Sequence, residues 1–346
     1  MTKALSRRQI LSAGAAMVAT GCARKPEDFT LREVSVALSE HLSLASVYLA
    51  DELGLFAEAG FRLNRVRLSA RDAIPVLAGG KLDIAFGGVA APLLAAVANG
   101  MAIRVVAGRE VADPECGESF SLYANKAIFG TGPVDPQKLR GRRICIRKRG
   151  ISEFLLDTFL KLNGIPYDAV EKVDLPLNEA IAALASQRID ALLDVEFARS
   201  PVAASAEIVR VWRFADTQPG HQYSFILFGK AMLADTPGAA RFLAAYLEGA
   251  RRFLLGETPK FMSEFAATYS LNAEQVVKAC RKTFREDGSV DLPSLERLFA
   301  WQFERGYATL PLKVSQLVDT SHLQAAQRML SDGTWRVNPG AGKGGK

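Results

Sequence analysis

The chain has 346 residues, of which 49% are hydrophobic and 23% are charged, as in an ordinary globular protein with room for two domains. The formal charge of +6 falls to about +3 once a predicted leader is removed, so charge gives no support to a nucleic-acid-binding protein. The three histidines lie far apart, and the patterns H-E-x-x-H, C-x-x-C and G-x-S-x-G are absent. We therefore expect no metal, no cofactor and no catalytic residues.

Residues 1–22 are predicted to be a signal peptide with a lipoprotein cleavage box. Arg7 and Arg8 precede an apolar run that is too short for a membrane span, and small residues follow it. The closing ATGC makes Cys22 the predicted lipidation site, and ordinary cleavage beside an incidental cysteine is the alternative. We expect export by the twin-arginine or Sec route to the periplasm or cell envelope, with a membrane tether through Cys22.

Three cysteines follow the leader, at Cys116, Cys145 and Cys280. This odd number allows at most one disulfide in an oxidising compartment. Cys145 lies in a predicted buried strand, where a free cysteine behaves as a small apolar residue. We expect no disulfide.

Strands and helices alternate along the first part of the chain, which predicts βαβ units and a largely parallel sheet. Gly60 and Gly100 lie where helices are expected to end. The predicted strands are 34–38, 61–68, 82–88 and 102–108, and the predicted helices are 44–60, 71–80 and 90–100.

The same order of elements then restarts, which predicts a second, similar α/β lobe. An apolar-Asp-apolar motif occurs in both halves, at Asp83 and Asp190. Because each aspartate begins a strand directly after a helix, we expect both to satisfy turn N–H groups and to have no catalytic role. The predicted strands are 142–150, 169–175, 189–195 and 207–215, and the predicted helices are 151–164 and 178–188.

Two alternating segments, 119–129 and 223–233, match each other and are predicted to mark two crossings between the lobes. The last third of the chain has a helical pattern and is expected to pack on the first lobe. The predicted organisation is lobe 1 over 30–121 and 227–335, lobe 2 over 122–226, and a disordered Gly-rich tail over 336–346.

Ligands of open parallel sheets bind beyond the carboxyl ends of the strands, where helix N-termini attract anions. The basic loop 147–149, followed by a helix start, is the most electropositive strand end and predicts an anion clamp, with a solvated charge run as the alternative. Asp194 and Glu196 follow another strand and would hold a cationic or N–H group, or pair with the arginines. The candidates at these strand ends are Glu40, His41, Ser43, Ser69, Arg71, Gly87, Gly88, Val89, Arg147, Arg149, Gly150, Ser152, Asp194 and Glu196.

From about residue 34 to residue 108 the chain resembles the periplasmic solute-binding proteins of ABC transporters. The resemblance is to the NMT1/THI5-like group, which takes nitrate, sulfonate, taurine or thiamine-precursor pyrimidines. Its pattern is Tyr-x-Ala, then Gly-Leu-Phe-x-x-x-Gly, then Gly-x-x-Asp-x-Ala. The matching residues are Tyr48, Ala50, Gly54, Leu55, Phe56, Gly60, Gly80, Asp83 and Ala85.

This resemblance implies an α/β fold of the type II periplasmic-binding-protein class, with two mostly parallel lobes joined by two hinge strands that close on a small ligand. It implies a monomer that delivers its ligand to an inner-membrane ABC permease and catalyses no reaction. By matching positions, Ser43, Leu44, Ser69, Ala70 and residues 87–89 line the first-lobe side. Family members often carry a Gly pair where Ser69 and Ala70 stand, so the ligand's identity does not transfer.

The basic loop favours a ligand that is anionic or carries a carboxylate or sulfonate. Two alternatives are an enzyme on the same fold, related to thiamine-pyrimidine synthesis, and a ligand-sensing partner of a signalling receptor.

Overall fold

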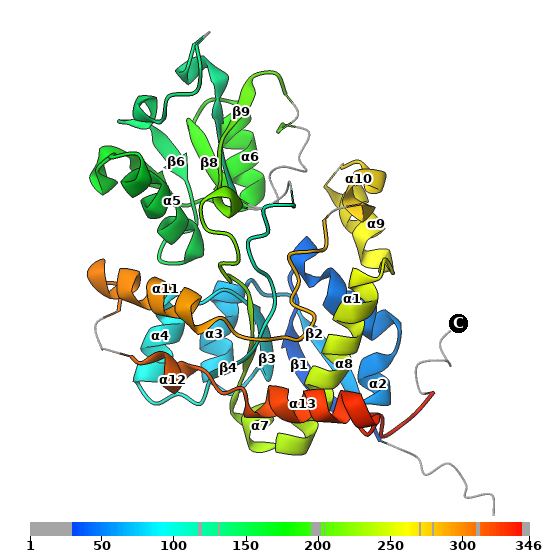
Figure 1. The fold of residues 1–346 in the computed structure, drawn as a ribbon. Coiled ribbons are helices and arrows are strands. Elements are labelled where there is room, and N and C mark those ends of the chain that lie inside the picture. The colour runs from blue at the N-terminus through cyan, green and yellow to red at the C-terminus, as the bar shows by residue number, and fades with distance from the viewer. Residues whose placement is uncertain are drawn as a thin grey trace, which may run out of the picture. The chain divides into compact units, whose positions relative to one another are not determined.

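The computed structural model describes residues 30–116, 120–130, 132–194, 202–203, 205–269, 271–278, 280–308 and 312–340. The predicted signal peptide, including Cys22, lies outside these residues, as does Glu196. The chain forms two five-stranded sheets flanked by helices (Figure 1), and we refer to each sheet with its packed helices as lobe 1 or lobe 2. No helix in the described ranges is both long and apolar enough to cross a bilayer.

The lobe 1 sheet has the strand order β2-β1-β3-β10-β4, and the lobe 2 sheet has the order β7-β6-β8-β5-β9. The lobe 1 strands are β1 Arg32–Ala37, β2 Phe61–Val66, β3 Ile84–Gly87, β4 Arg104–Gly108 and β10 Phe225–Phe228. The lobe 2 strands are β5 Ser121–Asn125, β6 Arg143–Cys145, β7 Glu171–Val173, β8 Ala191–Asp194 and β9 Ile208–Arg213.

Helices precede, connect and follow these strands as the sequence pattern predicts. The first six are α1 Ala45–Glu52, α2 Leu55–Glu58, α3 Ala70–Ala78, α4 Ala91–Ala98, α5 Ile151–Leu162 and α6 Leu177–Ala185. The later ones are α7 Lys230–Ala234, α8 Thr236–Leu254, α9 Lys260–Thr268, α10 Ala273–Val277, α11 Leu292–Glu304, α12 Val314–Leu317 and α13 Ser321–Asp332. Short 3₁₀ turns lie at Leu42–Leu44, Lys126–Ile128, Pro136–Leu139, Tyr167–Ala169 and Phe214–Asp216.

In each sheet one strand runs against its two neighbours. β10 pairs antiparallel with β3 and β4, and β5 pairs antiparallel with β8 and β9, whereas β1 and β6 pair in parallel with both of their neighbours. Each antiparallel strand is the first strand that the chain makes after crossing from the other lobe. The two matching segments of the sequence therefore occupy equivalent places, and the predicted mostly parallel α/β lobes are confirmed.

The repeated aspartates occupy equivalent places in the two sheets. The Asp83 carboxylate accepts hydrogen bonds from the backbone N–H and the hydroxyl of Ser35, both at 2.8 Å. The Asp190 carboxylate accepts a bond from the backbone N–H of Arg143, also at 2.8 Å. Both donors belong to the neighbouring parallel strand. The expectation that these aspartates satisfy N–H groups of turns is therefore wrong. The structural role holds, because each carboxylate satisfies a backbone group beside the point where parallel pairing begins.

The predicted helix 44–60 is two helices, because Gly54 adopts a left-handed conformation with φ 70°. That conformation ends α1 and lets α2 begin in a new direction. The break affects only the residues around Gly54, and the segments on both sides of it are helical as predicted.

Main-chain hydrogen bonds link the two crossings to a third segment, and we call residues 108–112, 221–224 and 283–288 the crossing ribbon. The N–H of Arg109 donates to the Ser224 carbonyl at 2.8 Å, and the N–H of Arg285 donates to the Arg109 carbonyl at 2.7 Å. Gly108 is required here, because a Cβ atom would overlap the side chain of Gln222 and the carbonyl of Ser289. The predicted lobe boundaries, after residues 121 and 226, fall at the first residue of β5 and within β10.

A disulfide joins Cys116 to Cys280, so the expectation of no disulfide is wrong. The two residues are 164 positions apart, and their Cα atoms lie 5.4 Å from each other. The first crossing carries Cys116, and Cys280 precedes the third segment of the ribbon, so pairing of these distant segments brings the sulfurs together. Cys145 is free and buried in β6, as predicted.

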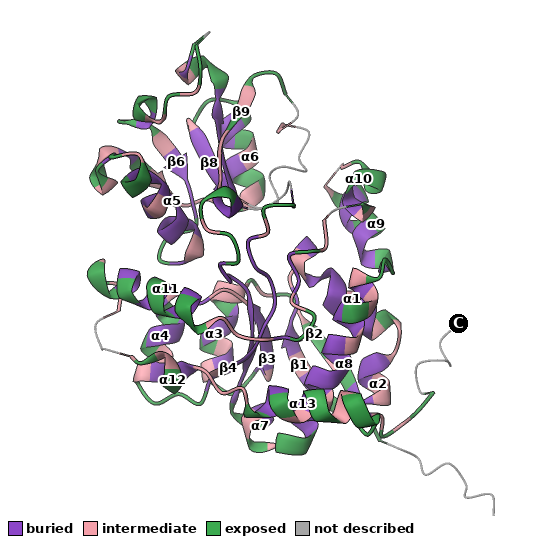
Figure 2. Ribbon diagram, viewed as in Figure 1, coloured by how far each residue is buried: buried purple, intermediate pink, exposed green. Residues whose placement is uncertain are grey.

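One hydrophobic core runs through both lobes. Leu298 and Trp301 of α11 belong to the same buried cluster as Leu155 and Phe159 of α5, and α11 contacts α5. Figure 2 shows the central strands of both sheets in the buried colour. The helical pattern of the last third predicted packing on lobe 1, but it does not reveal that α11 also packs on lobe 2.

The ring of His221, in the second crossing, is expected to make the fold sensitive to acid. Burial, reinforced by the nearby Arg297 guanidinium, lowers the pKa of His221 from 6.5 to about 4. The unfolded chain therefore binds this proton more readily, and stability that is full above pH 6.5 is lost as the pH falls toward 4. Between pH 7 and pH 5 we expect the native chain to lose about 2 kcal/mol more unfolding free energy than His221→Gln. Urea denaturation at both pH values measures the difference, and equal losses would contradict it.

The disulfide is expected to stabilise the fold by closing a long loop. Reduction, or Cys280→Ser, should lower the free energy of unfolding by about 2–4 kcal/mol. Thermal and urea denaturation measure this, and Cys145→Ser serves as the cysteine control that leaves the bond intact. A native chain that melts at the same temperature with and without reductant, after thiol titration shows reduction, would refute the expectation.

Candidate functional site

A cavity of about 330 Å³ is lined by residues from both lobes. They include residues at the carboxyl ends of β1, β2 and β3 in lobe 1 and of β6 and β8 in lobe 2. The cavity therefore lies at the edge of both sheets where the strand-end rule predicts a site. The predicted residues that line the cavity are His41, Ser43, Leu44, Ser69, Arg71, Gly87, Gly88, Val89, Arg147, Gly150, Ser152 and Asp194.

Two predicted site residues in the described ranges do not line this cavity. Glu40 forms an ion pair with Arg67 at 2.7 Å. Arg149 has a left-handed backbone, with φ 59°, and its guanidinium lies over the ring of Tyr307, 5.7 Å from the ring centre. The three consecutive basic residues of the predicted clamp therefore do not act together at the cavity.

The turn between β3 and α4 and the start of α3 form one wall. Ser69 caps α3, with its hydroxyl oxygen accepting from the Asp72 N–H at 3.2 Å. Gly87 lies against Ala70, and its φ of 155° together with the space that Ala70 fills excludes a side chain there. The glycine predicted to allow close approach of a ligand is thus also needed for the packing of α3 on β3.

The N-terminus of α5 forms part of the opposite wall. Gly150 is its N-cap and supplies no side-chain cap, and Ile151 and Ser152 line the cavity. The backbone N–H groups of a first helical turn lack intrahelical partners and attract anions. The Glu153 carboxylate in the same turn accepts from the N–H of Arg149 at 2.6 Å and offsets part of this positive character.

An ion-pair group crosses from one lobe to the other at the cavity. Asp174 of lobe 2 pairs with Arg71 of α3 at 3.2 Å and with Arg147 at 2.8 Å. Arg71 also donates to the carbonyl of Lys148 at 2.6 Å. Two guanidinium groups share one carboxylate, so this group carries one excess positive charge.

The sequence reasoning missed an apolar wall supplied by the C-terminal helices. Phe253 lies in the last turn of α8 and Met262 lies in α9, segments that were expected only to pack on lobe 1. Phe284 stacks edge-on against Phe253, with 5.2 Å between the ring centres. Only the folding of these helices over the strand edge brings them to the cavity, so no local sequence signal marks them.

The strand-end rule itself would have found two more residues had it been applied to β4. Arg109 and Glu110 directly follow that strand, and Glu110 lines the cavity. Arg109 lies behind the wall, where its side chain is in contact with Ser43 and Ser224. The presence of two polar residues directly after an apolar strand was the sequence signal that could have identified them.

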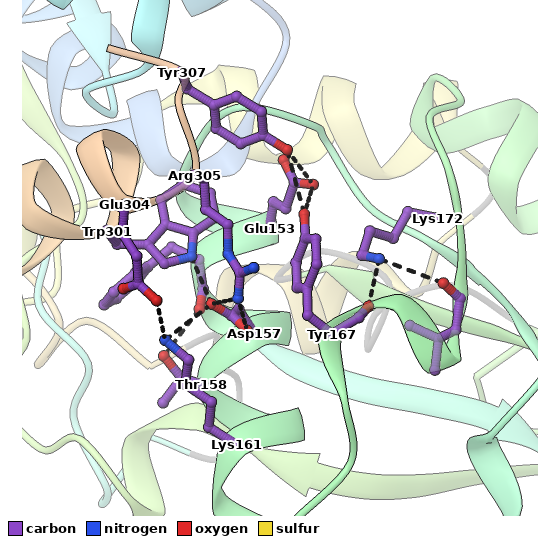
Figure 3. Close-up of polar contacts among 12 residues, drawn as sticks. Glu153, Asp157, Thr158, Lys161, Tyr167, Lys172, Trp301, Glu304, Arg305 and Tyr307 are labelled. Atoms are coloured by element: carbon purple, nitrogen blue, oxygen red, sulfur yellow. Dashed lines mark hydrogen bonds and ion pairs between the residues drawn. The ribbon is translucent and has the colours of Figure 1, made fainter. Parts of the chain in front are cut away.

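A second polar group joins α5 of lobe 2 to α11 and the segment that follows it (Figure 3). Asp157 of α5, whose side chain is 1% exposed, accepts from the Trp301 indole N–H at 2.7 Å and from Arg305 at 2.8 Å. The Glu153 carboxylate accepts from the hydroxyl groups of Tyr307, at 3.0 Å, and Tyr167. We call these six residues the α5–α11 cluster.

Proton affinities in this cluster follow from burial. Burial, with the hydrogen bond to Glu153, raises the pKa of Tyr167, and burial is also the main cause that raises the pKa of Tyr307. Both phenols therefore remain protonated donors toward Glu153 at neutral pH. The described residues contain no group of His, Cys, Asp and Glu side chains with the spacing to hold a metal ion.

Comparison with known proteins gives a family match. The family model described as NMT1/THI5 like matches residues 42–255. Comparison with curated protein sequences finds no significant match.

Solved structures share the architecture. The alkanesulfonate-binding protein SsuA from Xanthomonas axonopodis pv. citri, bound to MOPS, is 15% identical, with a TM-score of 0.65 over 83% of this chain and 98% of that one. The periplasmic nitrate-binding protein NrtA from Synechocystis PCC 6803 is 12% identical, with a TM-score of 0.67 over 88% and 91%. A ligand-binding component of an ABC-type import system from Staphylococcus aureus is 13% identical, with a TM-score of 0.68 over 86% and 99%. At these identities the likeness shows the fold, which is the type II periplasmic-binding-protein fold.

Gly87→Ala is expected to disturb the cavity wall and the fold together. The new methyl group would meet Ala70 and force either α3 or the turn after β3 to move, at a cost of about 1–3 kcal/mol in unfolding free energy. Gly132→Ala is the matched control, because nothing lies within 4 Å of the added atom there. Urea denaturation of both variants measures the difference, and equal stabilities would show that the close packing at Gly87 is not required.

Proposed function

The chain belongs to the NMT1/THI5-like family, and from this we propose that it is the extracytoplasmic solute-binding component of an ABC importer. It captures one small ligand in the cavity between its lobes and passes it, chemically unchanged, to an inner-membrane permease. The observation that carries the proposal is the cavity itself, which residues from both lobes line at the carboxyl ends of their strands.

Closure of the lobes on the ligand is the proposed mechanism. A ligand that contacts both walls binds better when the lobes are together, and only this difference in affinity shifts the equilibrium toward the closed form. Arg71 and Asp174, which pair across the lobes at 3.2 Å, would separate on opening, and Asp174 would keep its pair with Arg147. The permease would then recognise the closed surface.

The proposed ligand combines an anionic group with an apolar body. Excess positive charge at Arg71 and Arg147, and the uncapped start of α5, support the anionic group. Phe86, Phe253 and Met262 support the apolar part, since such side chains stabilise a ligand only by removing apolar surface from water. The neighbours that bind alkanesulfonate or nitrate agree with the anionic group and do not identify the ligand.

Placement in the cell is part of the same proposal. The predicted leader, with lipidation at Cys22, would hold the protein at the outer face of the membrane beside its permease. A disulfide between Cys116 and Cys280 fits an oxidising compartment.

Native mass spectrometry of the protein purified from its own host tests the function directly. We expect a copurified small solute at a 1:1 ratio that is released unchanged on denaturation. Arg147→Ala should lower the affinity for an anionic solute by up to about tenfold, because the variant removes one positive charge from the cavity wall. Arg188→Ala, an exposed arginine of lobe 2 outside the cavity, is the matched control.

Two results would overturn the proposal. Chemical conversion of the solute by the purified chain would support the enzyme alternative. If no solute copurifies and no member of a broad thermal-shift library raises the melting temperature, the binding function is wrong.

A further inference from the structure

Arg109 is a buried cation directly behind the cavity wall. It follows β4, and the residue is 1% exposed. Its guanidinium donates to the Ser224 hydroxyl oxygen at 2.9 Å, to the Tyr246 hydroxyl at 3.3 Å and to the Ser43 carbonyl. It also lies over the ring of Phe86, 5.3 Å from the ring centre.

All of these partners are electrically neutral. No carboxylate of the described residues forms an ion pair with Arg109, and its guanidinium instead donates three hydrogen bonds to neutral oxygens. A buried charge without a countercharge is costly, and dipoles and a ring face offset that cost only in part. The positive potential of Arg109 is weakly screened because the surroundings contain little water.

That potential reaches the cavity through the atoms Arg109 contacts. Ser43, Ser224 and Phe86 all line the cavity. Because the Ser224 oxygen accepts from Arg109, its hydroxyl hydrogen is directed away from the guanidinium and is available to an acceptor in the cavity. Arg109 therefore both orients a donor and places a positive charge behind it.

Other charged groups at the cavity also contribute to the electrostatic potential there. Glu110 and Asp194 also line the cavity, and Arg71 and Arg147 pair with Asp174 of lobe 2. Of these charged groups, Arg109 is the one held by the Ser43–Ser224–Phe86 wall of lobe 1. An anion placed against that wall would supply the missing countercharge.

Building on the proposed function, we propose that Arg109 is a specificity-determining positioning residue, which selects ligands whose anionic group lies against Ser43 and Ser224 on the lobe 1 wall. The group is a monoanion of the carboxylate or sulfonate kind, and it accepts a hydrogen bond from Ser224. Arg109 does not touch the ligand and acts through Ser224 and through its charge.

The test compares two probes of nearly equal shape, benzenesulfonate and its neutral analogue benzenesulfonamide, by isothermal titration calorimetry on the full chain. We expect the native chain to bind the anion at least about tenfold more tightly than the amide. Arg109→Met should remove this preference, and Arg109→Lys should keep most of it. Ser224→Ala, which retains the charge, should reduce the preference by a smaller factor. Arg62→Met, on the exposed face of β2, is the matched control and should behave as the native chain.

The ratio of the two affinities separates this role from a purely structural one. A residue needed only for packing would weaken both probes equally, and that result would overturn the inference. Retention of the preference in a folded Arg109→Met, or binding of neither probe by the native chain, would also overturn it. If Arg109→Met does not fold, the ratio in Ser224→Ala and Arg109→Lys decides. A neutral solute copurifying with the native chain would refute the inference and leave the proposed binding function intact.

Discussion

Main-chain hydrogen bonds within the crossing ribbon tie together the segments that join the two lobes, and the site depends on this connection. The three segments come from positions about 110, 222 and 285, and each satisfies backbone groups of another at Val111, Ala112 and Arg285. Buried backbone donors and acceptors must be paired, so the segments cannot separate without a large cost in free energy. Because the ribbon adjoins β4, β5 and β10, the carboxyl ends of the strands from both sheets border one cavity.

Two polar groups that join the lobes differ in how far they are withdrawn from water. In the α5–α11 cluster, Asp157 is withdrawn from water and paired with Arg305 and Trp301, and breaking such a pair leaves a buried charge without a partner. The Arg71–Asp174 pair is partly exposed and therefore weaker. Opening of the lobes would thus be expected to keep the first group and break the second, which places the axis of the proposed movement near α5 and α11.

Much of the fold could be predicted because its signals are local. The apolar-Asp motif at Asp83 and Asp190 identified two equivalent lobes, and the strand-end rule found Ser69, Gly87 and Arg147 at the cavity. What could not be predicted depends on long-range contacts. The disulfide between Cys116 and Cys280, the contact of α11 with α5 and the wall made by Phe253 and Met262 arise only when distant segments pack together. The basic residues of the predicted clamp do not meet at the cavity, because the left-handed backbone of Arg149 directs its side chain toward Tyr307. The sequence pattern does not reveal this backbone conformation.

The state of the sulfur atoms has a practical consequence. Cys116 and Cys280 are bonded to each other and Cys145 is buried, so within the described residues no cysteine offers an accessible thiol. In a chain that begins after Cys22, a cysteine introduced at an exposed lobe 2 position such as Asn178 would be the single place where a maleimide dye attaches. The native cysteines would not have to be replaced, so optical readout of solute uptake becomes possible on an otherwise unaltered molecule.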